Sequence, residues 1–160
     1  MSIKAIVGLG NIGEEYQKTY HNVGNFVAEK LKHLALASER DLKIYPLTGF
    51  MNESGDPIVK WLKMNNLITD AVVVAHDDSD LSVGSYKLVR GGGSAGHKGI
   101  ESLAAHLGTG DFWRLRIGVR DPAEQVRKKA GEFVLEQWSG AQEKEFVGVA
   151  QRAWPEIAAL

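Results

Sequence analysis

His21 is the residue whose surroundings in the sequence best suit acid–base chemistry. It stands at the start of a predicted helix, while a carboxylate, Asp77, and two carboxamides, Asn11 and Asn52, follow predicted strands. A histidine oriented by a carboxylate can take a proton from water, and carboxamides can bind carbonyl or amide groups without adding charge. These residue types favour hydrolysis by a histidine-activated water. A purely structural role for His21 as a helix cap is the alternative.

Other catalytic arrangements find little support in the sequence. No serine stands in a nucleophile elbow, no H-E-x-x-H motif is present, and the five histidines lack the spacing of metal ligands. The absence of cysteine excludes disulfides, thiolate metal sites and a cysteine nucleophile, and it fits a reducing cytoplasm. We therefore expect no metal and no other cofactor.

The segment IVGLGNIG (6–13) contains a G-x-G-x-x-G motif directly after an apolar run, which is the spacing of a dinucleotide-binding loop. Such a loop should lead straight into a helix, and an acidic residue should end a second strand about 20 residues later. Here polar residues delay the helix, Glu14 and Glu15 stand where a pyrophosphate would lie, and no second strand is available. The glycines are better explained as a turn that presents Asn11.

Apolar runs of strand length alternate with helix-like segments, which predicts a single α/β domain over residues 1–160. The sheet is expected to be mixed, mostly parallel and flanked by helices. Strands are predicted at 3–9, 43–47, 70–76, 85–89 and 112–119. Helices are predicted at 21–36, 57–66, 96–108 and from about 141 onward. No apolar run reaches transmembrane length.

Polar residues collect where the predicted strands end, which is where open α/β sheets place their sites. Asn11 follows the first strand, and the acidic run 77–80 follows the central one. A glycine-rich loop at 91–99 brings His97 and Lys98 to the start of a helix, where main-chain N–H groups favour an anion. Together with the loop that carries Asn52, these segments predict one cleft built from four loops.

Charge is unevenly distributed along the chain. Residues 86–130 hold nine Lys or Arg residues against four acidic ones, a formal charge of +5, whereas the whole chain has a net charge of −1. A basic half of this kind suits a phosphate-rich partner. Solvated charge spread over several faces is the simpler alternative.

Five motifs, in this order, give the chain a resemblance to the bacterial-type peptidyl-tRNA hydrolase family over nearly its whole length. They are VGLGNIGEEYQKTYHNVG, FMNESG, HDDSDLSVG, GGGSAGHKG and FWRLRIGV. The resemblance implies a single α/β domain that hydrolyses the ester joining a peptide, or another N-blocked aminoacyl group, to the 3′ end of tRNA. It also implies a cytoplasmic monomer that acts in translation, with no cofactor and no membrane partner.

The resemblance assigns roles to individual residues. His21 falls on the family's catalytic histidine, Asp77 on the carboxylate that orients it, and Asn11 on a position that helps distinguish blocked from free aminoacyl groups. Arg116 falls on a basic position used near tRNA phosphate, and Arg90 lies next to another. Contacts with the tRNA 3′ end or the peptide are implied for Tyr16, Phe50 and Asn52.

Several features depart from the family pattern. Lys98 stands where the family usually has asparagine, so a group that donates and accepts becomes a donor-only cation. Ile12 replaces a proline that would stiffen the turn carrying Asn11. The segment 34–50 is short, which predicts fewer strands, and the C-terminus comes early. A catalytically weak RNA-binding module is therefore a second hypothesis, although the retained histidine, carboxylate and carboxamides favour the enzyme.

Overall fold

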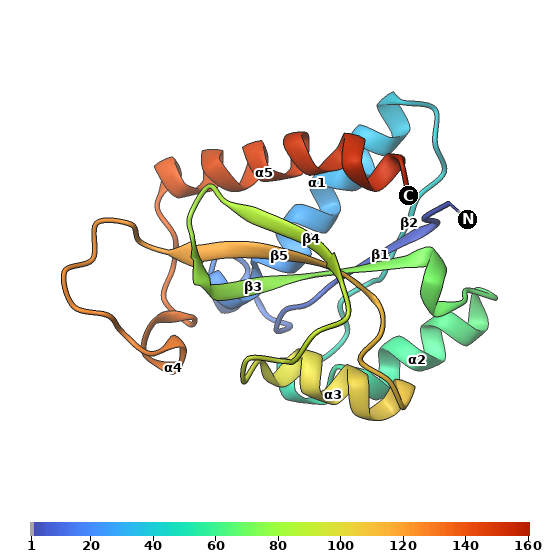
Figure 1. The fold of residues 1–160 in the computed structure, drawn as a ribbon, viewed down its shortest axis with the longest axis horizontal. Helices are drawn as coiled ribbons and strands as arrows, with labels where there is room; N and C mark the ends of the chain where they lie inside the picture. Colours follow the sequence, from blue (N-terminus) through green and yellow to red (C-terminus); the bar gives the residue numbers. More distant parts are fainter. Residues whose placement is uncertain (1) are drawn as a thin grey trace.

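A computed structural model describes residues 2–160 and contains a five-stranded sheet between two layers of helices (Figure 1). The strands are β1 (Ala5–Gly8), β2 (Lys43–Ile44), β3 (Val72–Ser82), β4 (Tyr86–Arg90) and β5 (Trp113–Arg120). Their order across the sheet is β2-β1-β3-β5-β4, with β4 antiparallel to β5 and the other pairs parallel. The predicted α/β fold with a mixed, mostly parallel sheet is confirmed. The short segment 34–50 adds only the two-residue β2 to the sheet.

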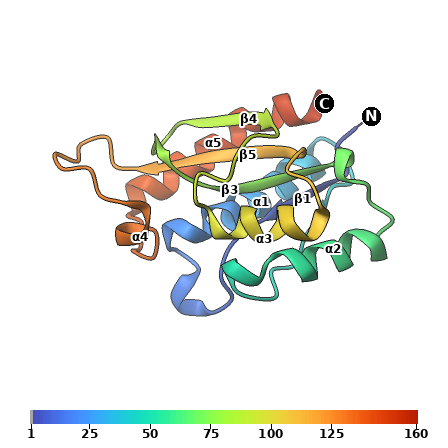
Figure 2. The same ribbon diagram turned by 60° about the horizontal axis from the view of Figure 1, so that its bottom comes forward.

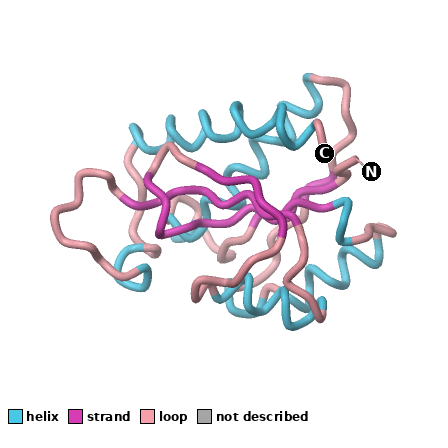
Figure 3. Tube along the Cα trace, viewed as in Figure 1, coloured by secondary structure: helices cyan, strands magenta, loops and turns pink. Residues whose placement is uncertain are grey.

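Helices α1 and α5 cover one face of the sheet, and α2 and α3 cover the other (Figures 1 and 2). The helices are α1 (Val23–Ala37), α2 (Gly55–Met64), α3 (Lys98–Leu107), α4 (Ala130–Phe133) and α5 (Gly140–Ala158). Short 3-10 turns are η1 (Glu14–Tyr16), η2 (Tyr20–Asn22), η3 (Met51–Glu53) and η4 (Thr69–Ala71). The loop between β5 and α4 projects beyond the sheet (Figure 3). Within residues 2–160, no helix has both the length and the apolar character needed to cross a bilayer.

Two apolar clusters join the helices to the sheet. One contains Leu31 of α1 and Phe146 of α5, and the other contains Leu103 of α3. The strands contribute to both clusters because successive side chains point to opposite faces, so Ile6 joins the first cluster and Val7 the second. This burial on both faces explains why the central strands have continuous apolar sequences.

Strand β3 is longer than the sequence predicts. A strand was expected over 70–76 with a polar loop after it, but β3 continues to Ser82. Asp77 and Asp78 remain in the strand because they pair with two consecutive residues of β5, and both are buried. The prediction of a loop at 77–80 is wrong, since acidic residues can occupy a buried strand when their charges are paired.

Helix α1 lies very close to β3, and Gly24 in its first turn permits the approach. A Cβ atom at Gly24 would lie 2.1 Å from the carbonyl oxygen of Ala75 and 3.0 Å from Cα of His76. Both are main-chain atoms, so no side-chain rotation could relieve the overlap. This contact sets the start of α1, and therefore His21 in η2, beside the part of β3 that carries Asp77.

We expect Gly24→Ala to lower the free energy of unfolding by about 1–3 kcal/mol or more, because the added methyl group forces α1 away from the strand. Urea denaturation would measure the change. Gly140→Ala is the matched control, since Gly140 also lies in the first turn of a helix but a Cβ atom there would meet no other part of the protein within 4 Å. Alanine there should be neutral or slightly stabilising. Equal stability of the two variants would contradict the close packing of α1 on β3.

Candidate active site

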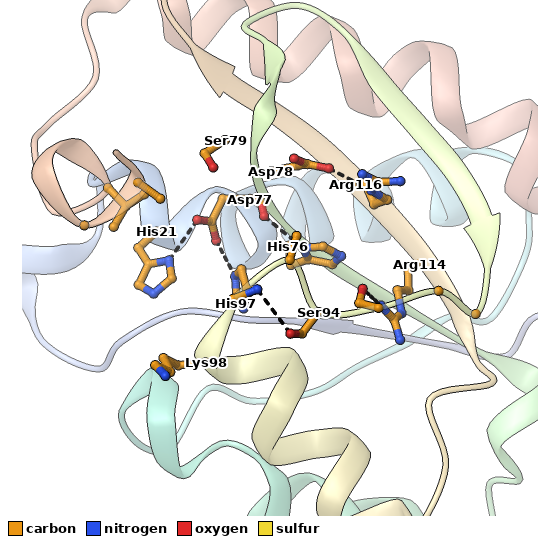
Figure 4. A pocket seen from close by; sticks show the side chains of 18 residues that line it. His21, His76, Asp77, Asp78, Ser79, Ser94, His97, Lys98, Arg114 and Arg116 are labelled. Carbon is orange, nitrogen blue, oxygen red and sulfur yellow. Dashed lines mark hydrogen bonds and ion pairs between the residues drawn. The ribbon is translucent and has the colours of Figure 1, made fainter. Parts of the chain in front are cut away.

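A cavity of about 490 Å³ lies beside the second half of β3. Side chains of β3 and β5 form one side of it, and η2, the glycine-rich segment 91–98 and residues 130–134 enclose it (Figure 4). The predicted site residues that line it are His21, Asp77, Lys98 and Arg116. The structure therefore brings together part of the predicted cleft.

The Asp77 carboxylate lies between two imidazole rings. His21 Nδ1 is 2.8 Å from Asp77 Oδ2, and His97 Nε2 is 2.7 Å from Asp77 Oδ1. An ionised carboxylate only accepts hydrogen bonds, so both of these ring nitrogens carry a proton. His97 Nδ1 also accepts the main-chain N–H of Ile100 at 3.3 Å. Because His21 Nδ1 donates its proton to Asp77, the lone pair of a neutral His21 ring is on Nε2.

The two histidines determine the charge of Asp77. Burial by itself would raise the pKa of this carboxyl group, since only 4% of the residue is exposed. The adjacent His97 ring and the hydrogen bonds from His21 and His97 outweigh burial and hold the pKa of Asp77 well below its usual range. Asp77 is therefore negative at neutral pH and can stabilise an imidazolium on His21.

His97 was not among the predicted site residues. The sequence predicts that the glycine-rich loop brings His97 to the cleft at the start of a helix, without a role for its side chain. His97 caps α3 through Nδ1, and its other nitrogen reaches Asp77. The His21 and His97 ring centroids are 5.0 Å apart. The available signal was a histidine at the end of a glycine-rich loop, although the pattern does not reveal which carboxylate it contacts.

Asn11 is fixed by Asn22, a second residue that sequence reasoning missed. The main-chain N–H of Asn11 donates to Asn22 Oδ1 at 2.8 Å, and its carbonyl accepts from Asn22 Nδ2 at 2.9 Å. Asn11 Oδ1 accepts the main-chain N–H of Met51 at 2.7 Å. Asn11 Nδ2 has no hydrogen-bond partner among residues 2–160, so it can donate to a ligand. Because Asn22 directly follows His21, it couples the two loops.

Ile12 holds the Asn11 turn in a way that proline cannot. Its main-chain N–H donates to the carbonyl of Gly49 at 3.0 Å, and proline has no such N–H. This bond joins the loop after β1 to the loop that carries Phe50 and Asn52. The stiffness expected to be lost with the proline is thus offset by a cross-loop hydrogen bond.

The remaining polar and aromatic residues of the predicted site lie outside the cavity lining. Tyr16 and Phe50 meet edge to face with ring centroids 6.4 Å apart, and Phe50 is 48% exposed. Asn52 is exposed in η3, next to the Met51 that contacts Asn11. These residues form an adjoining surface around the Asn11 turn, which we call the Asn11 rim (Asn11, Tyr16, Phe50 and Asn52).

The three predicted cations occupy different settings. Lys98 lines the cavity with 69% of its side chain exposed. Arg116 also lines it, and its Nε lies 2.7 Å from a carboxylate oxygen of Asp78. Arg90 is outside the lining, and its guanidinium pairs with two aspartates at 2.7 and 2.8 Å. The structure therefore brings Lys98 and Arg116 to the cavity but not Arg90.

His21, Asp77 and His97 offer possible metal-ligand atoms that lie within 4.8 Å of one another. Ligands of a tetrahedral zinc ion lie about 2.1 Å from the metal and hence about 3.4 Å from each other. The N···O distances here are 2.8 and 2.7 Å, which are hydrogen-bond lengths. The arrangement suits protons between these groups better than a metal ion.

The family model described as peptidyl-tRNA hydrolase matches residues 5–160. The chain belongs to the peptidyl-tRNA hydrolase family. The peptidyl-tRNA hydrolase of Geotalea daltonii is 41% identical over 156 residues, which covers 87% of this chain and 80% of that protein. The corresponding protein of Cupriavidus metallidurans is 40% identical over 146 residues, covering 81% and 74% of the two chains.

Solved structures of peptidyl-tRNA hydrolases share the fold. A mutant enzyme from Acinetobacter baumannii gives a TM-score of 0.81 at 30% identity, covering 99% of this chain and 88% of that one. A complex of peptidyl-tRNA hydrolase with N-propanol gives 0.79 at 29% identity, covering 98% and 87%. The family inferred from the five motifs is confirmed, while the roles of individual site residues stay predictions.

A third histidine lies beside the pair in this member of the peptidyl-tRNA hydrolase family. His76 precedes Asp77 in β3, lines the cavity, and donates from Nδ1 to the main-chain carbonyl of Asp77 at 2.9 Å. Burial, followed by the effect of the adjacent His97, lowers the pKa of His76 to about 4. At the near-neutral pH at which His21 would accept a proton, the His76 ring is therefore neutral.

The depressed pKa of His76 predicts acid sensitivity in a defined range. Below pH 6.5 the unfolded chain protonates this ring while the folded protein does not until about pH 4, so stability falls across that window. The loss should reach about 3 kcal/mol by pH 4. Urea denaturation from pH 7 to 4 would show a flatter profile for His76→Asn, which keeps a donor for the carbonyl. The exposed His33→Asn is the control, and parallel profiles for wild type and His76→Asn would contradict the assignment.

Proposed function

We propose that this chain cleaves the ester between a peptide, or another N-blocked aminoacyl group, and the 3′ end of tRNA, with His21 as the base that activates water. Membership of the family makes peptidyl-tRNA the substrate, so the proposal concerns the residues that do the work. The observation that carries it is the His21–Asp77 hydrogen bond of 2.8 Å at the edge of the cavity.

Each proton in the reaction has a place. A water in the cavity gives a proton to His21 Nε2 while its oxygen attacks the ester carbonyl carbon, and Asp77 stabilises the resulting imidazolium. When the tetrahedral intermediate collapses, the bond between the acyl carbon and the ribose 3′ oxygen breaks, and His21 returns the proton to that departing oxygen. The products are a carboxylic acid and free tRNA. Proton transfer of this kind contributes roughly 10²- to 10⁴-fold to the rate.

In the proposed reaction Asn11 supplies a neutral donor from the adjoining Asn11 rim. Its Oδ1 is occupied by the N–H of Met51, so Nδ2 is the group that can meet a carbonyl oxygen of the substrate. A donor aimed at the developing oxyanion is worth about 3 kcal/mol. The other residues of the Asn11 rim, Tyr16, Phe50 and Asn52, would contact the peptide or the terminal nucleotide.

The tRNA body would be held through its phosphates near Lys98 and Arg116, which gives binding that weakens as salt rises. Arg90 would take part only if it exchanged its aspartate partners for phosphate. The working unit in this proposal is a single-domain monomer. Acting on peptidyl-tRNA would place the enzyme in the cytoplasm with translation.

We expect His21→Ala to lose at least about 10²-fold in turnover, because the variant lacks the Nε2 lone pair that takes the proton from water. Release of N-blocked amino acid from tRNA measures turnover, and binding of deacylated tRNA should change by less than about threefold. His33→Ala, a histidine on the exposed face of α1, is the control. Wild-type turnover in His21→Ala would reject the proposed base. A wild-type protein that binds tRNA without turnover would favour the RNA-binding module.

Lys98→Asn should change KM more than kcat, since the ammonium group lies at the rim of the cavity rather than beside His21. The same release assay, run over a range of substrate concentrations, separates the two constants. Lys60→Asn is a matched control, because Lys60 is equally exposed and also pairs with a carboxylate one helical turn away. If both constants stay at their wild-type values, Lys98 has no part in binding.

A further inference from the structure

Arg120, the last residue of β5, is buried at the edge of the site without lining the cavity. Only 8% of it is exposed. Its guanidinium donates to the carbonyl of Ser79, to a carboxylate oxygen of Glu124, and to the carbonyl of Lys128 at 2.9 Å. The same group lies 5.2 Å from the centroid of the Phe133 ring. A buried cation needs such partners, and here they come from three separate segments.

The first of these segments is the part of β3 just beyond Asp77. Strands β3 and β5 pair regularly as far as Asp78, the register then shifts, and pairing resumes between Ser82 and Arg120. Between Asp78 and Ser82, the residues of β3 therefore do not pair regularly with β5. Arg120 satisfies the carbonyl of Ser79, which lies next to Asp78 on the strand (Figure 4). The side chain of Arg120 thus fixes the strand two residues after Asp77.

The second segment holds the main chain of His21. Phe133, over which the Arg120 guanidinium lies, is followed by Val134, whose carbonyl accepts the main-chain N–H of His21 at 2.7 Å. The two segments stay in contact at the neighbouring residues, because the main-chain N–H of Tyr20 donates to the carbonyl of Glu136 at 3.1 Å. The end of α4 and the residues after it therefore hold the His21 backbone, in addition to the packing of α1 on β3.

We propose that Arg120 is a positioning residue for the His21–Asp77 pair. Its guanidinium ties the strand that carries Asp77 to the helix end that holds the backbone of His21, so it fixes both members of the pair from outside the cavity. Arginine suits this task because its planar group presents several donors in a fixed geometry and stacks on an aromatic ring. Displacement of a catalytic group by about 1 Å can lower the rate about 10²-fold. The kinetic part of this inference rests on the proposed function.

Arg120→Met tests the proposal, with Arg40→Met as the matched control. Arg40 also donates to a main-chain carbonyl, that of Ala158, and lies 5.7 Å from the Trp154 ring centroid, but it is at the opposite end of the sheet. We expect kcat of Arg120→Met to fall roughly 10- to 100-fold with KM changed by less than about threefold. Arg40→Met should keep both constants near wild type.

Histidine side-chain NMR supplies a readout that needs no turnover. In wild type the neutral His21 ring should carry its proton on Nδ1, and in Arg120→Met it should show a mixture of tautomers as the bond to Asp77 weakens. Arg120→Lys keeps the charge without the planar fork and should give an intermediate spectrum and kcat; it also replaces Arg120→Met if that variant does not fold.

The outcomes separate two questions. An unchanged His21 tautomer in Arg120→Met, or in Arg120→Lys if only that variant folds, overturns the positioning role whatever happens to kcat, because any lost activity would then arise elsewhere. A mixed tautomer with reduced kcat supports it. A mixed tautomer with wild-type kcat also supports the positioning role, but contradicts the use of His21 as the base in the proposed function.

Discussion

The arrangement of the site depends on one buried carboxylate, Asp77, staying ionised inside the protein. A charge in a poorly hydrated place is tolerated only when it is paired and hydrogen-bonded. His21 and His97 meet this need from positions 56 and 20 residues away in the chain, each through a different carboxylate oxygen. Removing either ring would leave one oxygen of the buried carboxylate without its hydrogen-bond donor. Strand β3 and the starts of α1 and α3 must therefore keep their relative positions.

These three positions belong to three layers of the fold. Asp77 comes from the sheet, His21 from the turn before α1 on one face, and His97 from the cap of α3 on the other face. Each helix layer is anchored to the sheet by its own apolar cluster. The carboxylate therefore joins two independently packed layers at the end of β3, and small residues such as Gly24 matter because they set how closely one layer approaches it.

The sequence specifies the elements of this fold better than their contacts. Apolar runs and helical spacing predict all five strands and the four longer helices, because both depend on local patterning. The extension of β3 through Asp77 and Asp78 was missed, since polarity suggests a loop and only pairing with β5 reveals the strand. His21 and Asp77 are predicted as site residues from their places at the ends of predicted elements, and the structure brings them together, whereas the contacts of His97 and Asn22 are long-range hydrogen bonds that no local pattern encodes.

Local sequence also does not reveal which charged residues pair with one another in the fold. The formal +5 of residues 86–130 suggests a strongly basic surface, yet Arg90, Arg116 and Arg120 each pair with a carboxylate. A paired cation gains less from a phosphate than a free one, because it must share or give up its partner. Attraction for RNA is therefore smaller than the count of cations implies. If tRNA phosphate reaches Arg116, it competes there with Asp78, one residue from the carboxylate that holds His21, so RNA contact and the geometry of the His21–Asp77 pair are linked through β3.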